Sequence, residues 1–206
     1  MQPGKTPSTL FLDIGGVLLT NGWDRGSRRK AAELFGLDYE EMNERHHLTY
    51  DTYESGKISL KEYLDRIVFY EKRDFSYEDF RTFIFDQSKA YPEMIDLVKF
   101  LKQKYRLKVG VISNEGREVN DYRIGRFKLN DLIDFFISSS FVHIRKPDRD
   151  IYKIALDIAQ VLPEDSVYID DRLMFVQIAA GFGLKSIHHV NYNSTVSELV
   201  KLGLTL

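Results

Sequence analysis

The chain has 206 residues, and its 29 basic and 31 acidic residues give a formal net charge of −2. This balance argues against bulk electrostatic binding of nucleic acid, and no apolar run is long enough to span a bilayer. Cysteine is absent, which excludes disulfides, thiol catalysis and cysteine-based zinc or iron–sulfur sites. We therefore expect a cytoplasmic globular protein, a monomer or homodimer, that binds neither nucleic acid nor membranes.

Five short segments are typical of buried parallel strands, because several of them are near-continuous apolar runs. Helical patterns separate most of them, which predicts a doubly wound, Rossmann-like parallel α/β sheet. The predicted strands are Thr9–Asp13, Lys108–Ser113, Phe135–Ser139, Ser166–Asp170 and Lys185–Val190, and the predicted helices around the later strands are Met94–Lys104, Arg149–Gln160, Met174–Ala180 and Thr195–Leu202.

The interval between the first two predicted strands contains no convincing strand and is too long for a single crossover. Ser59 and Glu62 have the spacing of a capping box, which indicates a helix start. We interpret residues 19–91 as an all-helical cap subdomain, and residues 1–18 together with 92–206 as the α/β core domain. The predicted cap helices are Arg28–Phe35, Tyr39–His46, Leu60–Phe69 and Tyr77–Phe85.

Asp13 ends the first predicted strand and is followed by Gly15 and Gly16. A carboxylate at the carboxyl edge of a parallel sheet is positioned for ligands or chemistry, and a buried charge is costly unless something pairs it. The alternative is an ordinary turn aspartate before paired glycines. Asp13 taken alone does not decide between the two.

Polar residues also follow three later strands, and the ends of all four strands converge on one crevice in a doubly wound sheet. Ser113 and Asn114 end the second strand, and Lys146 lies in the loop after the third. Asp170 and Asp171 end the fourth. Each motif alone could be a turn, a surface loop or a helix cap, but the ordered set is much more specific.

This set of residues is chemically coherent for phosphoryl transfer. Asp13 can act as a covalent nucleophile that forms an aspartyl-phosphate. The clustered carboxylates need a cation, and their hard oxygen atoms suit Mg²⁺. Ser113 and nearby backbone N–H groups can bind phosphate oxygens. Lys146 can neutralise the phosphate and keep the nucleophile ionised.

The four motifs resemble those of the haloacid dehalogenase-like (HAD) superfamily, and the resemblance spans essentially the whole chain. Within the superfamily, the chain is similar to small bacterial HAD proteins and to sugar-phosphate phosphatases with Asp-x-Gly in their first motif. The resemblance implies the strand order 5-4-1-2-3 and a cap that closes on the crevice. The motifs are Asp13-x-Gly-Gly-Val-Leu, Ile112-Ser-Asn114, Lys146-Pro and Tyr168-Ile-Asp-Asp171.

The same resemblance assigns a role to each motif residue. It implies that Asp13 is the nucleophile and that Lys146 bridges this carboxylate and the phosphate. The implied Mg²⁺ ligands are Asp13, the Gly15 carbonyl, Asp171 and, directly or through water, Asp170, and the implied phosphate-binding residues are Ser113, Asn114 and Gly16.

Gly15 departs from the pattern of most HAD phosphatases, which carry a second aspartate at this position. That aspartate protonates the leaving group and then activates water, and general acid–base catalysis is typically worth roughly 10²–10⁴-fold. Glu115 and Asp24 are the candidate surrogate acids. In the alternative interpretation, Glu115 caps the following helix and Asp24 pairs with Arg25 on the surface.

The leading prediction is a Mg²⁺-dependent phosphatase of a small phosphorylated metabolite, with sugar phosphates as the first candidates. A haloacid dehalogenase is the second interpretation, because those relatives also lack the second aspartate and need no metal ion. The paired Asp170 and Asp171 count against it, as do two glycines where the dehalogenases carry an aromatic residue. A non-catalytic, phosphate-binding pseudo-enzyme is the third, although the retention of all four motifs argues against loss of function.

Overall fold

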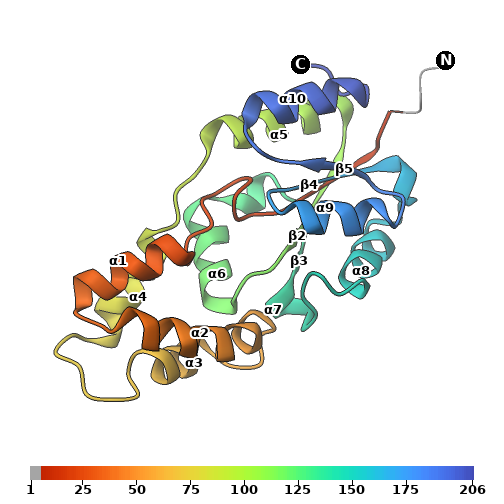
Figure 1. The fold of residues 1–206 in the computed structure, drawn as a ribbon. Helices are drawn as coiled ribbons and strands as arrows, with labels where there is room; N and C mark the ends of the chain where they lie inside the picture. Colours follow the sequence, from red (N-terminus) through yellow and green to blue (C-terminus); the bar gives the residue numbers. More distant parts are fainter. Residues whose placement is uncertain (1–5) are drawn as a thin grey trace.

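The computed structural model describes residues 6–206 and contains a five-stranded sheet with helices on both faces (Figure 1). The strand order is β3-β2-β1-β4-β5, and every neighbouring pair is parallel. Read from the other edge, this is the predicted order 5-4-1-2-3, so the predicted fold class is confirmed. The strands are β1 (Thr9–Leu12), β2 (Lys108–Ser113), β3 (Phe135–Ser138), β4 (Ser166–Asp170) and β5 (Lys185–His188).

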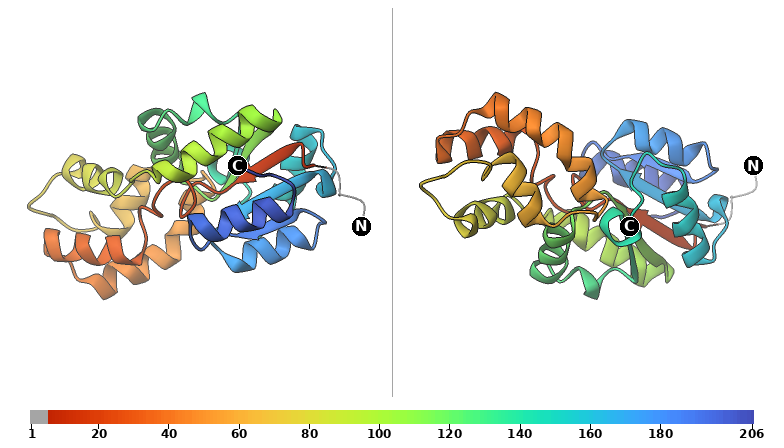
Figure 2. Two further views of the ribbon diagram at one scale, coloured as in Figure 1. Left: turned by 90° about the horizontal axis from the view of Figure 1, so that it is seen from above. Right: turned by 90° about the horizontal axis from the view of Figure 1, so that it is seen from below.

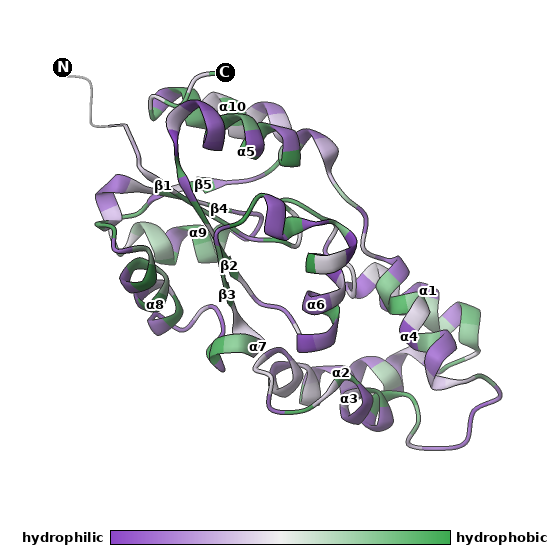
Figure 3. Ribbon diagram, turned by 180° about the vertical axis from the view of Figure 1, so that it is seen from behind, coloured by the Kyte–Doolittle hydropathy of each residue, from purple (hydrophilic) through white to green (hydrophobic). Residues whose placement is uncertain are grey.

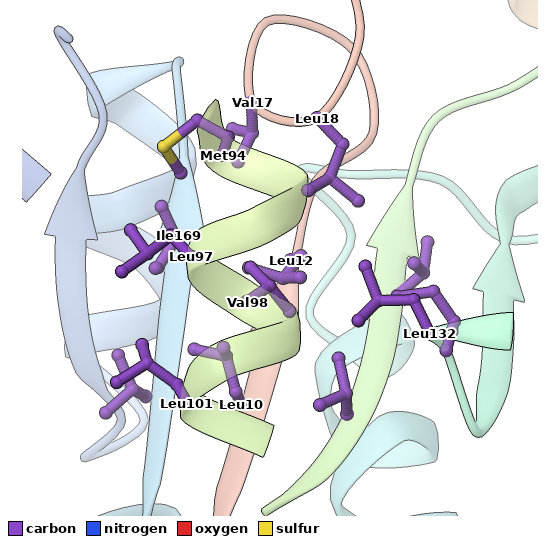
Figure 4. Close-up of a cluster of buried hydrophobic side chains, with 14 of the residues drawn as sticks. Leu10, Leu12, Val17, Leu18, Met94, Leu97, Val98, Leu101, Leu132 and Ile169 are labelled. Carbon is purple, nitrogen blue, oxygen red and sulfur yellow. The ribbon is translucent and has the colours of Figure 1, made fainter. Parts of the chain in front are cut away.

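The central strand β1 is buried on both faces, and its side chains alternate between two hydrophobic clusters. Leu10 and Leu12 pack against the helices on one face, and Figure 4 shows Leu101 beside Leu10 and Val98 beside Leu12. Phe11 packs into the cluster on the other face. The first face is covered by α5 (Pro92–Tyr105) and α10 (Tyr192–Lys201), and the second by α8 (Asp150–Ala159) and α9 (Leu173–Ala180) (Figure 1).

The core helices match their predicted ranges to within three residues at each end. Apolar and polar residues alternate along their ribbons, as expected for helices with one face on a sheet (Figure 3). The structure adds four short or polar elements that were not predicted from the sequence. They are α6 (Arg117–Arg126), α7 (Ser139–Val142) and the 3₁₀ turns η1 (Leu129–Asp131) and η2 (Pro163–Asp165).

Four helices between β1 and α5 form a separate lobe, at the end of the molecule away from the N-terminus in both views of Figure 2. Trp23, Tyr63 and Phe80 belong to a hydrophobic cluster built mainly from this lobe. The cluster supports the proposed division of the chain at residues 19–91. The helices are α1 (Arg25–Phe35), α2 (Tyr39–Glu54), α3 (Leu60–Ile67) and α4 (Tyr77–Asp86).

The capping box predicted at Ser59 forms. The Ser59 side chain accepts a hydrogen bond from the Glu62 N–H, and the Glu62 carboxylate accepts one from the Ser59 N–H. The predicted end of the second cap helix at His46 is wrong. Helix α2 continues for eight further residues to Glu54, through threonines and tyrosines with modest helix propensity. Tertiary contacts hold this extension, since Tyr53 is buried and Glu54 pairs with Arg145.

The two segments that join this lobe to the core run side by side. Leu19 and Ala90 form an antiparallel bridge, and Thr20 N–H donates to the Lys89 carbonyl at 2.8 Å. We refer to these paired segments as the hinge, because they connect the core to the helical lobe. Within residues 6–206, no helix has the length and apolar character needed to cross a membrane.

Candidate active site

Asp13 lies one residue beyond the end of β1, where its N–H still donates to the Ile169 carbonyl of β4 at 2.9 Å. The residue is 7% exposed. Its Oδ1 accepts hydrogen bonds from Ser113 Oγ at 2.6 Å and from Ile14 N–H at 2.9 Å. Oδ2 accepts none from the described residues, so this oxygen is the one available to a ligand or a reacting group.

Lys146 is 1% exposed, and its Nζ lies between two carboxylates. The distances are 3.3 Å to Asp13 Oδ1 and 2.6 Å to Asp170 Oδ2. Asn114 fixes the lysine backbone, because its side-chain amide accepts from Lys146 N–H at 2.8 Å and donates to the Lys146 carbonyl at 2.9 Å. The Asn114 side chain therefore positions the lysine, and the phosphate contact of this residue stays a prediction.

Asp170 is fully buried, and both of its oxygens are engaged. Oδ2 accepts from Lys146 Nζ and from the Tyr168 hydroxyl, and Oδ1 accepts from Arg172 N–H at 2.7 Å. A direct metal bond would compete with these contacts. We therefore propose that Asp170 orients Lys146 and acts on a metal ion through water, which is one of the two possibilities predicted for it.

Asp171 is half-buried, and its Oδ2 accepts from Asn21 Nδ2 at 3.0 Å. A side chain at Gly16 would collide with this carboxylate, and Gly16 has φ of +74°. The single donor of Gly16, its N–H, already bonds the Leu19 carbonyl at 2.7 Å. This N–H is thus engaged within the loop, the phosphate contact of Gly16 stays a prediction, and the absence of a side chain lets Asp171 approach the loop after β1.

The carboxylates of this site fit a divalent cation. Asp13, Asp170 and Asp171 each offer a ligand atom, and these atoms lie within 4.8 Å of one another. Asp171 Oδ1 is buried and has no hydrogen-bond partner among residues 6–206. Buried polar atoms are normally partnered, and oxygen ligands are those that Mg²⁺ prefers.

The charges of the site also favour the binding of a cation beside Asp13. Burial raises the pKa of Asp13 to about 7; Lys146 opposes the increase and Asp170 adds to it. Burial acts to lower the pKa of Lys146, but the two carboxylates outweigh it and hold the pKa above its usual value. The lysine is therefore cationic at neutral pH, while ionisation of Asp13 is opposed unless another cation binds.

The site opens into a cavity of about 870 Å³ between the core and the cap helices. Aromatic side chains from the cap form much of its far wall. Several of them also belong to the cap's own hydrophobic cluster. The cap residues that line the cavity include Trp23, Asp24, Arg28, Asn43, Tyr50, Tyr53, Glu54 and Tyr63.

Both candidate surrogate acids line this cavity. Glu115 is 5% exposed, and its Oε1 lies 2.5 Å from Arg123 Nη1. It does not cap α6, whose N-cap is Gly116. Asp24 is exposed and caps α1 by accepting from Ser27 N–H at 2.7 Å, in place of the surface pair with Arg25 considered as its alternative.

Arg123 is a site residue that the sequence did not reveal. It is 2% exposed on α6 and donates to Glu115, to Ser88 Oγ at 3.0 Å and to the Thr20 carbonyl at 3.3 Å. A Cβ at Gly15 would lie 3.8 Å from Arg123 Nη1. The Arg123–Glu115 pair therefore stands beside the position of the missing second aspartate and next to the hinge.

A sequence model of the haloacid dehalogenase-like hydrolases matches residues 7–183. The chain belongs to this family. A phosphorylated carbohydrates phosphatase from Thermotoga maritima is 26% identical to this HAD hydrolase over 184 residues, which cover 88% of the chain and 84% of that protein.

Solved structures share the fold of this HAD hydrolase. A HAD family enzyme from Bacteroides thetaiotaomicron has a TM-score of 0.76 at 21% identity, covering 89% of this chain and 93% of that one. The same enzyme has been solved with magnesium and inorganic phosphate. An L-2-haloacid dehalogenase from Xanthobacter autotrophicus, with chloropropionic acid covalently bound, has a TM-score of 0.63 at 15% identity, covering 97% and 85%.

The burial of Asp13 makes the metal-free hydrolase sensitive to pH. Because its pKa rises from the ordinary 3.8 to about 7, the folded protein binds more protons here than the unfolded chain between these values. The contribution of Asp13 to the free energy of unfolding therefore falls as pH rises from about 4 to about 7, by an amount on the order of a few kcal/mol. Urea unfolding in chelator at pH 5 and pH 7.5 measures it.

Asp13→Asn isolates this contribution from those of other titrating groups. We expect the variant to lose less stability than the wild type between the two pH values, and Mg²⁺ to stabilise the wild type more at pH 7.5 than at pH 5. Equal losses of unfolding free energy in the two proteins would show that burial does not raise the pKa of the Asp13 carboxylate.

Proposed function

We propose that this HAD hydrolase is a Mg²⁺-dependent phosphatase of a small phosphorylated metabolite, acting through an aspartyl-phosphate on Asp13. The observation that carries the proposal is the arrangement around Asp13. One carboxylate oxygen is fixed by Ser113 and faces Lys146, the other is available, and the unpartnered Asp171 Oδ1 belongs to the same cluster. Sugar phosphates are the first substrate class, as the name of the Thermotoga relative also indicates.

In the proposed first step, Asp13 Oδ2 attacks phosphorus, and the bond from phosphorus to the leaving-group oxygen breaks as the new bond forms. Ser113 and Ile14 N–H hold Oδ1 and so fix the direction of Oδ2. Lys146 Nζ balances the charge of the phosphoryl oxygens. In the second step, water attacks the phospho-enzyme and releases phosphate, which restores the Asp13 carboxylate.

Asp13, Asp171 and the Gly15 carbonyl are the residues that would hold Mg²⁺. When bound, the ion supplies charge neutralisation at the transferring phosphoryl group. Asp170 is proposed to hold Lys146 in place, since both of its oxygens are already engaged. Asn114 clamps the backbone of the same lysine.

Between the two candidate acids, we propose Glu115. It is buried in the cavity wall beside position 15, whereas Asp24 is exposed and caps a helix. Burial raises the pKa of Glu115 above its usual value, although Arg123 opposes the increase. A raised pKa favours the protonated form that a general acid needs.

Glu115→Gln tests this role. We expect kcat for an alkyl phosphate to fall by roughly 10²-fold, while an aryl phosphate, whose leaving group departs without much protonation, changes by less than about fivefold. Asp24→Asn is the matched control and should leave both rates within about threefold. An equal loss on both substrates would show that Glu115 acts only by holding Arg123.

The experiment that tests the function is hydrolysis of p-nitrophenyl phosphate with Mg²⁺ or with chelator. Turnover that requires Mg²⁺ supports the phosphatase. Because the aryl group departs without much protonation, Gly15 in place of the second aspartate should not limit this assay. Acetyl phosphate, which is smaller and whose leaving group also departs without protonation, guards against exclusion of the aryl group by the cap.

A C–halogen hydrolase is the second candidate, and Gly15 is the observation that favours it, because displacement of halide needs no proton donor. Release of chloride from 2-chloropropionate in the presence of chelator would replace the phosphatase proposal. Tight binding of phosphate without turnover of any of these substrates would instead support a phosphate-binding pseudo-enzyme.

The position of the site in a cavity also indicates what kind of ligand it binds. A site in a cavity between core and cap favours small molecules, because closure of a cap excludes macromolecules as well as water. We propose a small phosphorylated substrate, no nucleic acid or membrane partner, a monomer or homodimer, and a cytoplasmic location.

A further inference from the structure

Arg28 is a buried cation in the cavity wall, opposite the core residues of the site. It lies on α1, is 6% exposed, and lines the same cavity as Asp13. No described carboxylate lies within 4.0 Å of its guanidinium group. Two other arginines of the cavity are paired, Arg123 with Glu115 at 2.5 Å and Arg145 with Glu54 at 2.6 Å.

Two neighbours fix the orientation of this guanidinium group. Asn43 Oδ1 accepts from both Nε and Nη2, at 3.3 and 3.2 Å, and the Trp23 carbonyl accepts from Nη1 at 2.9 Å. These bonds use three of the five N–H groups. One N–H on each terminal nitrogen has no acceptor among residues 6–206, and the two terminal nitrogens of arginine are spaced to match the two oxygens of a carboxylate.

The surroundings of Arg28 do not neutralise its charge. Burial, with help from Arg28 itself, lowers the pKa of His46 to about 3, so this histidine is neutral. The first turn of α1 contains no acidic residue, and the positive end of the helix dipole lies there. Asp24 is committed to capping this helix. Buried charges are normally paired, so an uncompensated arginine in a ligand cavity indicates an anionic group on the ligand.

We propose that Arg28 binds a carboxylate of the substrate, so that the substrate is a phosphorylated carboxylic acid. The inference rests on the proposed phosphatase function, since the phosphoryl group is taken to lie at Asp13. A single positive charge with two N–H groups matches a carboxylate better than a second phosphate, which carries more charge. Asn43 is a positioning residue that holds the guanidinium group in the cavity wall.

The test compares kcat/KM for pairs of substrates that differ in the second group. Glycerol 3-phosphate is compared with 3-phosphoglycerate, and glucose 6-phosphate with 6-phosphogluconate. We expect the wild type to prefer the acid in at least one pair by tenfold or more. Fructose 6-phosphate with fructose 1,6-bisphosphate tests a second phosphate, and a preference for the bisphosphate without one for an acid would overturn the carboxylate assignment.

Arg28→Gln should lower kcat/KM for the preferred acid by roughly 10²-fold, mainly through KM, and leave its neutral partner within about threefold. Arg29→Gln removes a neighbouring charge from the exposed side of α1, outside the cavity, and should keep the preference. An equal loss on both members of a pair, or no preference in the wild type, would overturn the proposal.

Folding and function are separated by further measurements. Thermal unfolding and p-nitrophenyl phosphate turnover show whether Arg28→Gln is intact. If it unfolds, Arg28→Lys keeps the charge but not the forked donors, and it should lose part of the acid preference while keeping aryl phosphate turnover; an unchanged preference would count against the proposal. Failure of the wild type on every phosphate would refute the phosphatase function itself, whereas aryl phosphate turnover without acid preference would refute only the role of Arg28.

Discussion

Asp13→Asn is expected to lower kcat for p-nitrophenyl phosphate by at least about 10⁴-fold, because it removes the proposed nucleophile and little else. Asparagine has nearly the same shape as aspartate, and its carbonyl oxygen can still accept from Ser113 and Ile14 N–H. Lys146 keeps its contact with Asp170. The loss should therefore be chemical and not structural.

The measurement pairs steady-state turnover with acid-quench trapping of the phospho-protein. We expect a trapped phosphoryl group in the wild type and none in the variant. The variant should fold at least as stably as the wild type at pH 7.5, because it relieves the burial of a carboxylate whose pKa is already raised. Turnover above about 1% of wild type, or a phospho-protein that persists in Asp13→Asn, would place the nucleophile elsewhere.

The sheet and the positions of the four motifs were predictable from the sequence. Strands β2 and β4 begin and end at the predicted residues, because both are buried runs that end in polar side chains. Since parallel strands share one carboxyl edge, Asp13, Ser113 and Asp170 had to converge once the strand order was known. This is why motif order predicted that Lys146 would lie beside Asp13, whereas its shorter contact to Asp170 was not predicted.

The hydrogen-bond partners of individual polar groups could not be predicted from the sequence. Gly16 and Asn114 were both predicted to bind phosphate, and in the structure the Gly16 N–H donates to the Leu19 carbonyl while the Asn114 side chain clamps Lys146. Both alternatives use ordinary hydrogen-bonding groups at short range. Only the path of the loops decides between them.

The contacts between cap and core are even harder to predict from the sequence, because they join residues far apart in the chain. Glu54 meets Arg145 across 91 positions, and Arg123 meets Ser88 across 35. Neither pair has a local pattern. Arg28 was not predicted as a site residue for a different reason. What distinguishes it is that no carboxylate of the described residues pairs with it, and a sequence cannot show that such a partner is missing.

Lys146→Met is expected to have the largest combined effect on stability and activity. The lysine is buried and lies 2.6 Å from Asp170 and 3.3 Å from Asp13. Removing one partner of a buried ion pair leaves an uncompensated charge and costs about 3–5 kcal/mol. Loss of the lysine should also raise the pKa of Asp13 further, because Lys146 is the main group that lowers it.

Activity should fall by at least about 10³-fold, both because less of Asp13 is ionised and because the phosphoryl charge is no longer balanced. Urea unfolding at pH 7.5 measures the stability, and p-nitrophenyl phosphate turnover measures the activity.

The double variant Lys146→Met/Asp170→Asn separates the two effects. It should recover most of the stability, since the stranded carboxylate is gone, but none of the turnover, since the cation beside Asp13 is still missing. If the single variant is as stable as the wild type, the Lys146–Asp170 pair does not hold the site together; if the double variant regains turnover, Lys146 has no role in catalysis beyond folding.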